Sequence, residues 1–274
     1  MAAKISLAAS PMLRKVADIQ FSFTRPAGIM QTVSLSLFRF DGLAARLWVL
    51  GQMGAARVAF AQMPDVGFWK LCGSGTGEGF TPKPNWGVWA ILAAWPDAET
   101  ARRTVADAGV YRRWRKMARE SWTVYLDPIS VRGKWSGKTP FLTGASAAQG
   151  ELPLAVLTRA SLRPTKMLQF WNRVPDISSV IGADPNVIFK IGIGEMPLLH
   201  QVTFSIWPDA SSMTSFARGD GPHGRAICAV RSGDWFTEEL YARFAVTGSS
   251  GLWGGRDPLA KPDTTAEFQP KDAA

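Results

Sequence analysis

Cysteine, histidine and tyrosine are scarce in this chain of 274 residues, which has two, two and three of them. With only Cys72 and Cys228, the sequence has no disulfide framework, and the reducing cytosol is the simpler compartment for it. Two histidines, His200 and His223, are too few for the histidine clusters of membrane di-iron hydroxylases. A site of two histidines and one carboxylate for non-haem iron would use both and would still need an acidic neighbour.

Several other common signatures are missing. The longest apolar stretches, such as 86–95, fall short of the roughly 20 residues of a membrane-spanning helix. A Gly-x-Ser-x-Gly hydrolase elbow and a complete Gly-x-x-x-x-Gly-Lys-Ser/Thr phosphate loop are also absent. The glycine-rich segment 73–79 has Glu78 where a dinucleotide fingerprint needs its third glycine, and a strand is expected next instead of a helix. It is better interpreted as a wide hairpin loop at the rim of a pocket.

Positive charge and tryptophan are abundant. The net charge of +9 favours acidic partners, such as an acidic protein or an anionic membrane surface, and no nucleic-acid-binding motif accompanies it. Twelve tryptophans either fill a core or line a site for a large, flat, apolar ligand, and the core is the commoner role.

The sequence also repeats itself. Phe68–Glu78, followed by an apolar run to Trp95-Pro96-Asp97, returns as Ile188–Glu195 and a run to Trp207-Pro208-Asp209. The two Trp-Pro-Asp signatures are 112 residues apart. Solenoid repeats have periods of roughly 20–50 residues, so this spacing indicates a duplicated domain. Each copy reads as strand, helix, strand, strand, helix, strand, with Asp97 and Asp209 as helix caps. The predicted strands cover 31–37, 67–72, 87–94 and 122–126, then 152–157, 187–191, 201–206 and part of 241–246; the predicted helices include 43–56, 111–120, 165–173 and 224–231.

This order predicts an α+β fold of two tandem ferredoxin-like βαββαβ repeats that form a pseudo-dimeric α+β barrel. The expected division is an N-terminal extension at 1–29, a first repeat at 30–143, a linker at 144–153, a second repeat at 154–250 and a disordered tail at 251–274. At the same offset of 112 residues, Tyr111 of the first copy corresponds to His223 of the second. A lone histidine at the start of a helix is more often a cap than a metal ligand, so the residues leave its role open.

Three longer stretches carry a resemblance to a known family: 68–80, 130–137 and 235–244. With them, the chain from Met30 to Trp253 resembles the spheroidene monooxygenases, the carotenoid-oxygenating enzymes of phototrophic bacteria. The resemblance implies a haem protein of carotenoid biosynthesis that takes electrons from reduced ferredoxin and uses O₂ to oxidise C2 of acyclic carotenoids. Two hydroxylations at that carbon and loss of water would give a ketone.

The resemblance also raises the importance of His223, which becomes the expected haem-iron ligand. His200 and Cys72 are the alternatives, and a cysteine thiolate would favour O–O cleavage. The candidates for protonating bound oxygen or pairing with haem propionates are Arg39, Lys70, Ser74, Glu78 and Glu195.

The expected location is cytoplasmic, with peripheral contact between the basic surface and the photosynthetic membrane, where so insoluble a substrate must be reached. Two other functions stay open. One is a non-catalytic barrel that carries carotenoid or haem, and the other is a cofactor-independent oxygenase of the ferredoxin-like kind.

Overall fold

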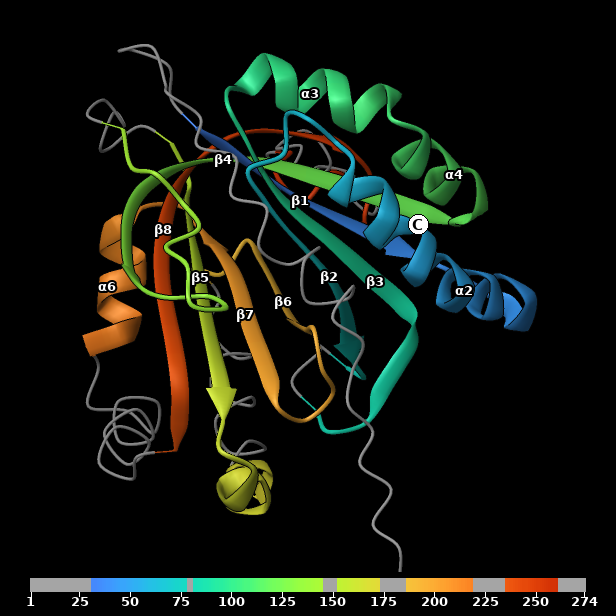
Figure 1. The fold of residues 1–274 in the computed structure, drawn as a ribbon. Helices are drawn as coiled ribbons and strands as arrows, with labels where there is room; N and C mark the ends of the chain where they lie inside the picture. Colours follow the sequence, from blue (N-terminus) through green and yellow to red (C-terminus); the bar gives the residue numbers. More distant parts are fainter. Residues whose placement is uncertain (1–30, 78–80, 145–151, 173–185, 219–234, 261–274) are drawn as a thin grey trace, which may run out of the picture.

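The computed structural model describes residues 31–77, 81–144, 152–172, 186–218 and 235–260, and its strands form one closed antiparallel barrel (Figure 1). The order of strands around the barrel is β1-β3-β2-β6-β7-β5-β8-β4. The strands are β1 (Thr32–Arg39), β2 (Phe68–Gly75), β3 (Pro84–Trp95), β4 (Glu120–Gly133), β5 (Leu154–Leu162), β6 (Phe189–Gly194), β7 (His200–Trp207) and β8 (Phe236–Gly251). The helices are α2 (Gly42–Ala61), α3 (Ala98–Asp107), α4 (Gly109–Met117) and α6 (Ala210–Arg218), and residues 167–172 are also helical.

The barrel consists of two four-stranded halves with the same internal order. That order is β4-β1-β3-β2 in the first half and β8-β5-β7-β6 in the second. The halves meet at a long β4–β8 seam and at a short β2–β6 seam, where Gly73 pairs with Gly194 and Ser74 with Ile193. The predicted α+β barrel is therefore confirmed.

Alternate strand residues fill the interior of the barrel with apolar side chains. In β1 the inward residues Val33, Leu35 and Leu37 are completely buried. The opposite face of the first half is covered by α2, α3 and α4, whose apolar residues form a second core with the outward side chains of the strands (Figure 1). The prediction of a half-buried strand at 31–37 is therefore wrong, because helices cover the side that the polar alternation assigned to water.

The two Trp-Pro-Asp junctions behave as predicted. Asp97 accepts a hydrogen bond from the backbone N–H of Thr100 at 2.7 Å and begins α3. Asp209 accepts one from Ser212 at 2.7 Å and begins α6, and this bond lowers the pKa of the Asp209 carboxyl. A side-chain oxygen that satisfies a free N–H in the first turn is the usual start of a helix.

The predicted disordered tail is wrong for residues 251–260. Trp253 and Arg256 form an isolated β-bridge, and Asp257 accepts hydrogen bonds from Trp122 Nε1 at 3.1 Å and from Ser249 Oγ at 2.8 Å. The prediction failed because it rested on the local proline-rich composition, whereas these contacts are made with residues of β4 and β8. The predicted extension at 1–29, most of the linker at 144–153, the helix at 224–231 and the end of the tail lie outside the described residues.

None of the helices that the structure describes combines the length and the apolar composition needed to cross a membrane.

Candidate functional site

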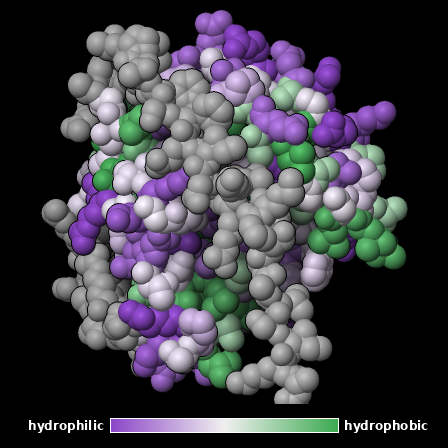
Figure 2. Space-filling view, viewed as in Figure 1, coloured by the Kyte–Doolittle hydropathy of each residue, from purple (hydrophilic) through white to green (hydrophobic). Residues whose placement is uncertain are grey.

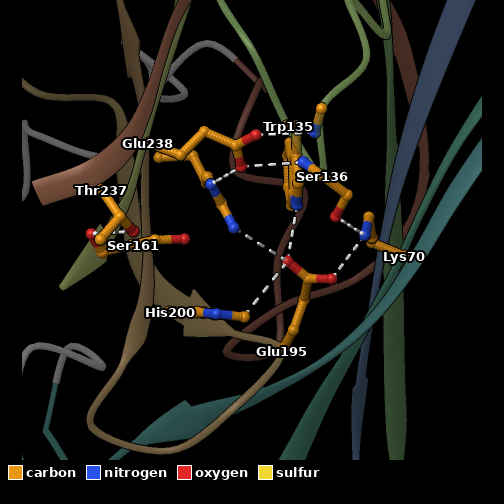
Figure 3. Close-up of polar contacts among 10 residues, drawn as sticks. Lys70, Trp135, Ser136, Ser161, Glu195, His200, Thr237 and Glu238 are labelled. Carbon is orange, nitrogen blue, oxygen red and sulfur yellow. Dashed lines mark hydrogen bonds and ion pairs between the residues drawn. The ribbon is translucent and has the colours of Figure 1, made fainter. Parts of the chain in front are cut away.

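Ionisable side chains meet at one end of the barrel interior. Lys70, Arg159, His200 and Glu238 lie on four different strands at positions that alternate with buried apolar residues, and Glu195 follows β6 directly. Because side chains of a strand alternate between its faces, all of them point toward the inside. Together with Trp135 and Ser136 from the turn after β4, they form what we call the polar cluster (Figure 3).

Glu195 is the centre of the polar cluster. Its carboxylate accepts hydrogen bonds from Lys70 Nζ and from Trp135 Nε1, each at 2.6 Å. The guanidinium of Arg159 lies 3.8 Å from Oε2 of the same carboxylate. The Glu195 side chain is 17% exposed, so these partners replace most of its water.

Glu238 provides the second carboxylate. It accepts hydrogen bonds from the backbone N–H groups of Ser136 at 2.8 Å and Gly137 at 2.7 Å, and from the Arg159 guanidinium. Burial alone would raise the pKa of Glu238, but the bonds from Gly137, Ser136 and Arg159 outweigh it and the pKa lies below its usual value. The cluster thus balances two cations with two carboxylates.

His200 completes the polar cluster as a neutral group. Its Nδ1 is 3.8 Å from Glu195 Oε2 and is buried with no hydrogen-bond partner among the described residues. Burial lowers the pKa of His200; Glu195 opposes this shift, while Arg159 and Lys70 add to it. The imidazole is therefore uncharged at neutral pH.

The turns that build the polar cluster have unusual backbone conformations. Across the described residues, the two non-glycine residues with positive φ are Ser136, at 54°, and Leu198, at 66°. Ser136 accepts a hydrogen bond from Lys70 at 2.7 Å, and Leu198 lies in the β6–β7 turn beside Glu195, where its carbonyl accepts one from Trp171 Nε1 at 3.0 Å. Strained backbone of this kind persists where surrounding contacts fix it, and it is concentrated at functional sites.

An apolar pocket adjoins the polar cluster. Its cavity volume is about 260 Å³, and Glu195 forms part of its wall. The other walls come from α2, the β2–β3 hairpin and the β6–β7 turn, and they include Leu50, Met53, Trp86, Trp89, Met196 and Leu198. The lining is mostly apolar, with a few polar residues such as Glu195 and Gln201, so it suits an apolar group.

A more polar cavity of about 360 Å³ lies near the end of β1. Arg39 lines it, pairs with Glu120 at 3.4 Å and lies 4.6 Å from the centre of the Trp253 ring. At the polar cluster, Arg159 is placed in the same way beside Glu238 and Trp135. In both places, an arginine on the first strand of one half lies over the tryptophan of the turn that follows the last strand of the other half.

The structure brings together only some of the residues predicted from the sequence. Lys70 and Glu195 form an ion pair, whereas Arg39 lines a different cavity and Ser74 borders both cavities. His223, the expected iron ligand, and Glu78 lie outside the described residues.

The alternative iron ligands are poorly placed for a haem. Cys72 is completely buried among the apolar residues of the barrel interior, where burial raises the pKa of its thiol, and it lines neither of the two cavities described above. His200 faces the polar cluster and lines neither of the two cavities described above. In the part of the chain that the structure describes, no group of three or more His, Cys, Asp or Glu residues could hold a metal ion.

Sequence reasoning missed Arg159, Glu238 and Trp135 as members of the site. Arg159 could have been found from the sequence. It is the next residue on the inward face of the strand after Ala155 and Leu157, and it carries a charge where an apolar residue is expected. A charged residue at an inward strand position needs a buried partner, which the sequence does not identify.

Comparisons with known proteins point to one family. The chain is 55% identical to the spheroidene monooxygenase of Cereibacter sphaeroides over 251 residues, which cover 89% of this chain and 77% of that protein. It is 55% identical to the spheroidene monooxygenase of Rhodobacter capsulatus over 84% of this chain and 96% of that protein. The enzyme of the same name from Rubrivivax gelatinosus is 33% identical over 78% of this chain and 81% of that protein. No family model matches the chain.

Among solved structures, an aldoxime dehydratase resembles the chain with a TM-score of 0.55 at 12% identity, covering 81% of this chain and 83% of that one. An aldoxime dehydratase in complex with butyraldoxime gives a TM-score of 0.53 at 12% identity, covering 81% of each chain. At such low identity the likeness shows a common fold and nothing more.

Proposed function

Because this chain belongs to the spheroidene monooxygenase family, we propose that it is a carotenoid monooxygenase that oxidises C2 of acyclic carotenoids such as spheroidene. The observation that carries the proposal is the identity of 55% to a spheroidene monooxygenase over 84% of this chain and 96% of the relative. Two successive hydroxylations at C2, followed by loss of water, would give the ketone.

The apolar pocket supports an apolar substrate. Trp86 and Trp89 offer flat surfaces to a polyene, and Leu50, Met53 and Leu198 add aliphatic walls. Its volume of about 260 Å³ is below the roughly 300–1,000 Å³ of sites for drug-sized ligands, so it suits one section of a long polyene.

The polar cluster contributes to this site by positioning. Glu195 and Leu198 belong to the β6–β7 turn that forms one wall of the pocket. The bonds from Lys70 and Trp135 to Glu195 hold that turn against the first half of the barrel. We therefore assign Lys70, Trp135 and Glu195 a role in fixing the shape of the pocket.

Haem is the proposed cofactor, with His223 as the ligand of its iron. The proposal rests on the family resemblance. It is supported by the placement of Cys72, which is completely buried, and of His200, which faces the polar cluster, since neither lines the two cavities described above. When bound, haem would supply the activation of O₂. Electrons would come from a reduced ferredoxin, and the net charge of +9 suits an acidic partner of that kind.

We also infer that the chain arose by duplication of a ferredoxin-like unit. The two halves of the barrel share their strand order, and each contains a Trp-Pro-Asp junction. The turns Gly133–Lys138 and Gly251–Arg256 also match, because each contains a β-bridge from its tryptophan to a basic residue. These similarities are what a fused dimer of α+β units would retain.

Reconstitution tests the function. The purified protein is incubated with spheroidene, ferredoxin, its reductase and O₂, and the optical and EPR spectra of the wild type and His223→Ala are compared. We expect C2-oxidised product, a haem spectrum in the wild type, and loss of that spectrum in His223→Ala but not in His200→Gln. Substrate returned unchanged would identify a carrier, product without haem absorbance would identify a cofactor-independent oxygenase, and haem retained in His223→Ala would exclude that ligand.

A further inference from the structure

Helix α2 is apolar on both of its sides. Its 20 residues include Arg46 and Arg57 but no acidic residue, and most of the others are aliphatic, aromatic or glycine. A helix that is hydrophobic all round is normally buried all round. Here only one side, with Val49, Ala56 and Phe60, packs against the sheet.

The other side of α2 presents large apolar residues to solvent. Leu43 is 74% exposed, Leu47 58%, Leu50 38% and Val58 58%. Successive helical residues are about 100° apart, so these four positions fall within one stripe along the helix. Figure 2 shows hydrophobic residues gathered at the side of the molecule where Figure 1 places α2. We call Leu43, Leu47, Leu50 and Val58 the α2 stripe.

The α2 stripe leads to the apolar pocket. Leu50 belongs to both, and Met53 on the next turn of the helix also lines the pocket. Trp86, which also lines the pocket, is 53% exposed. Tryptophan with one wet edge is typical of the boundary between water and lipid.

We propose that the α2 stripe docks the protein onto the surface of an anionic lipid bilayer, so that the apolar pocket opens toward the lipid. The charges on α2 are both positive and match such a surface, as does the net charge of +9. Four large exposed apolar residues beside these two arginines favour a lipid surface, which accepts apolar side chains, over an acidic protein, which the arginines alone would attract. That the pocket then receives a polyene directly from the bilayer rests on the proposed function, whereas the docking itself does not.

Vesicle binding tests the proposal. The full chain is sedimented with extruded vesicles of phosphatidylcholine alone and of phosphatidylcholine with phosphatidylglycerol. Compared variants are Leu43→Ser/Leu47→Ser, Val58→Ser and the control Leu168→Ser, because Leu168 is 74% exposed like Leu43 but lies on the helix at 167–172. Size-exclusion chromatography and circular dichroism of each variant establish its oligomeric state and folding.

We expect the wild type and Leu168→Ser to bind the anionic vesicles, and the Leu43→Ser/Leu47→Ser variant to bind about tenfold more weakly or worse. Val58→Ser, a single exposed change, should fold normally and bind with an intermediate affinity. A wild type that ignores anionic vesicles, or stripe variants that bind as well as the wild type, would overturn the proposal. So would a wild-type dimer that the stripe variants convert to monomer without a change in vesicle binding.

Turnover separates this proposal from the proposed function. If both hold, the stripe variants convert carotenoid dissolved in detergent micelles at the wild-type rate and lose conversion of carotenoid held in vesicles. If the chain is not an oxygenase, no protein converts either preparation, yet the difference in vesicle binding persists.

Discussion

Two ion pairs of equal length allow the energetic role of burial to be measured. Lys70 Nζ lies 2.6 Å from Glu195 Oε1, and Arg119 lies 2.6 Å from Asp41 Oδ2. The side chains of the first pair are 16% and 17% exposed, and those of the second are 72% and 46% exposed. We predict that only the pair in the polar cluster contributes substantially to stability.

The magnitude follows from the partners of Glu195. A hydrogen bond to a charged group contributes about 1.5–3 kcal/mol when it is shielded from water. Lys70 and Trp135 both donate to Glu195, so each bond can be separated from the other only by a double-mutant cycle. For Lys70→Met with Glu195→Gln we expect a coupling free energy of about 1.5–3 kcal/mol. Exposed pairs are screened by water and salt, so Arg119→Met with Asp41→Asn should give a coupling several-fold smaller.

The assay is urea unfolding of the wild type and of the single and double variants of both cycles, at low and at high sodium chloride concentration. The coupling of the buried pair should persist at high salt, and that of the surface pair should fall toward zero. Equal couplings in the two cycles, or equal sensitivity to salt, would refute the reasoning. They would mean that the polar cluster is as hydrated as the surface and does not hold the β6–β7 turn.

Two further predictions concern the same end of the barrel. Gly133 has a φ of 95°, and a Cβ there would overlap the carbonyl of Glu239, so Gly133→Ala should lower the free energy of unfolding by roughly 3 kcal/mol or more. Gly137 has a φ of 75° and no atom within 4 Å of an added Cβ, so Gly137→Ala should lower it by only about 1–2 kcal/mol. Similar losses in thermal unfolding would contradict this difference. Because the fold lowers the pKa of His200 below its unfolded value, its stabilising effect is complete above about pH 6.5 and declines as the pH falls below that value. Unfolding free energies measured from pH 7.5 to 5.5 should therefore fall less steeply in His200→Gln, and an unchanged slope would argue against the buried neutral imidazole.

Features that depend on neighbouring residues were predictable from the sequence. The alternation of Val33, Leu35 and Leu37 indicated a strand, because side chains of a strand face opposite sides in turn. Asp97 and Asp209 marked helix starts, because a cap needs only the next few N–H groups.

Features that depend on strand register were not predictable. Lys70 and Glu195 are 125 positions apart, and Arg159 and Glu238 are 79 apart. Both ion pairs form only because the strand pairings β2–β6 and β5–β8 bring their residues together in the closed barrel. The sequence made Lys70 and Glu195 candidates, but it did not show that they pair with each other or that Trp135 and Arg159 lie beside Glu195.

By itself, then, the sequence determined the elements of this protein, their order and the family to which the chain belongs, because these depend on local pattern and on identity with relatives. The tertiary structure decided which residues share the polar cluster, that the segment after β8 is held by Asp257, and that α2 leaves Leu43 and Leu47 uncovered. Each of these depends on contacts between distant parts of the chain. Such contacts form only when the barrel closes and brings the two halves together.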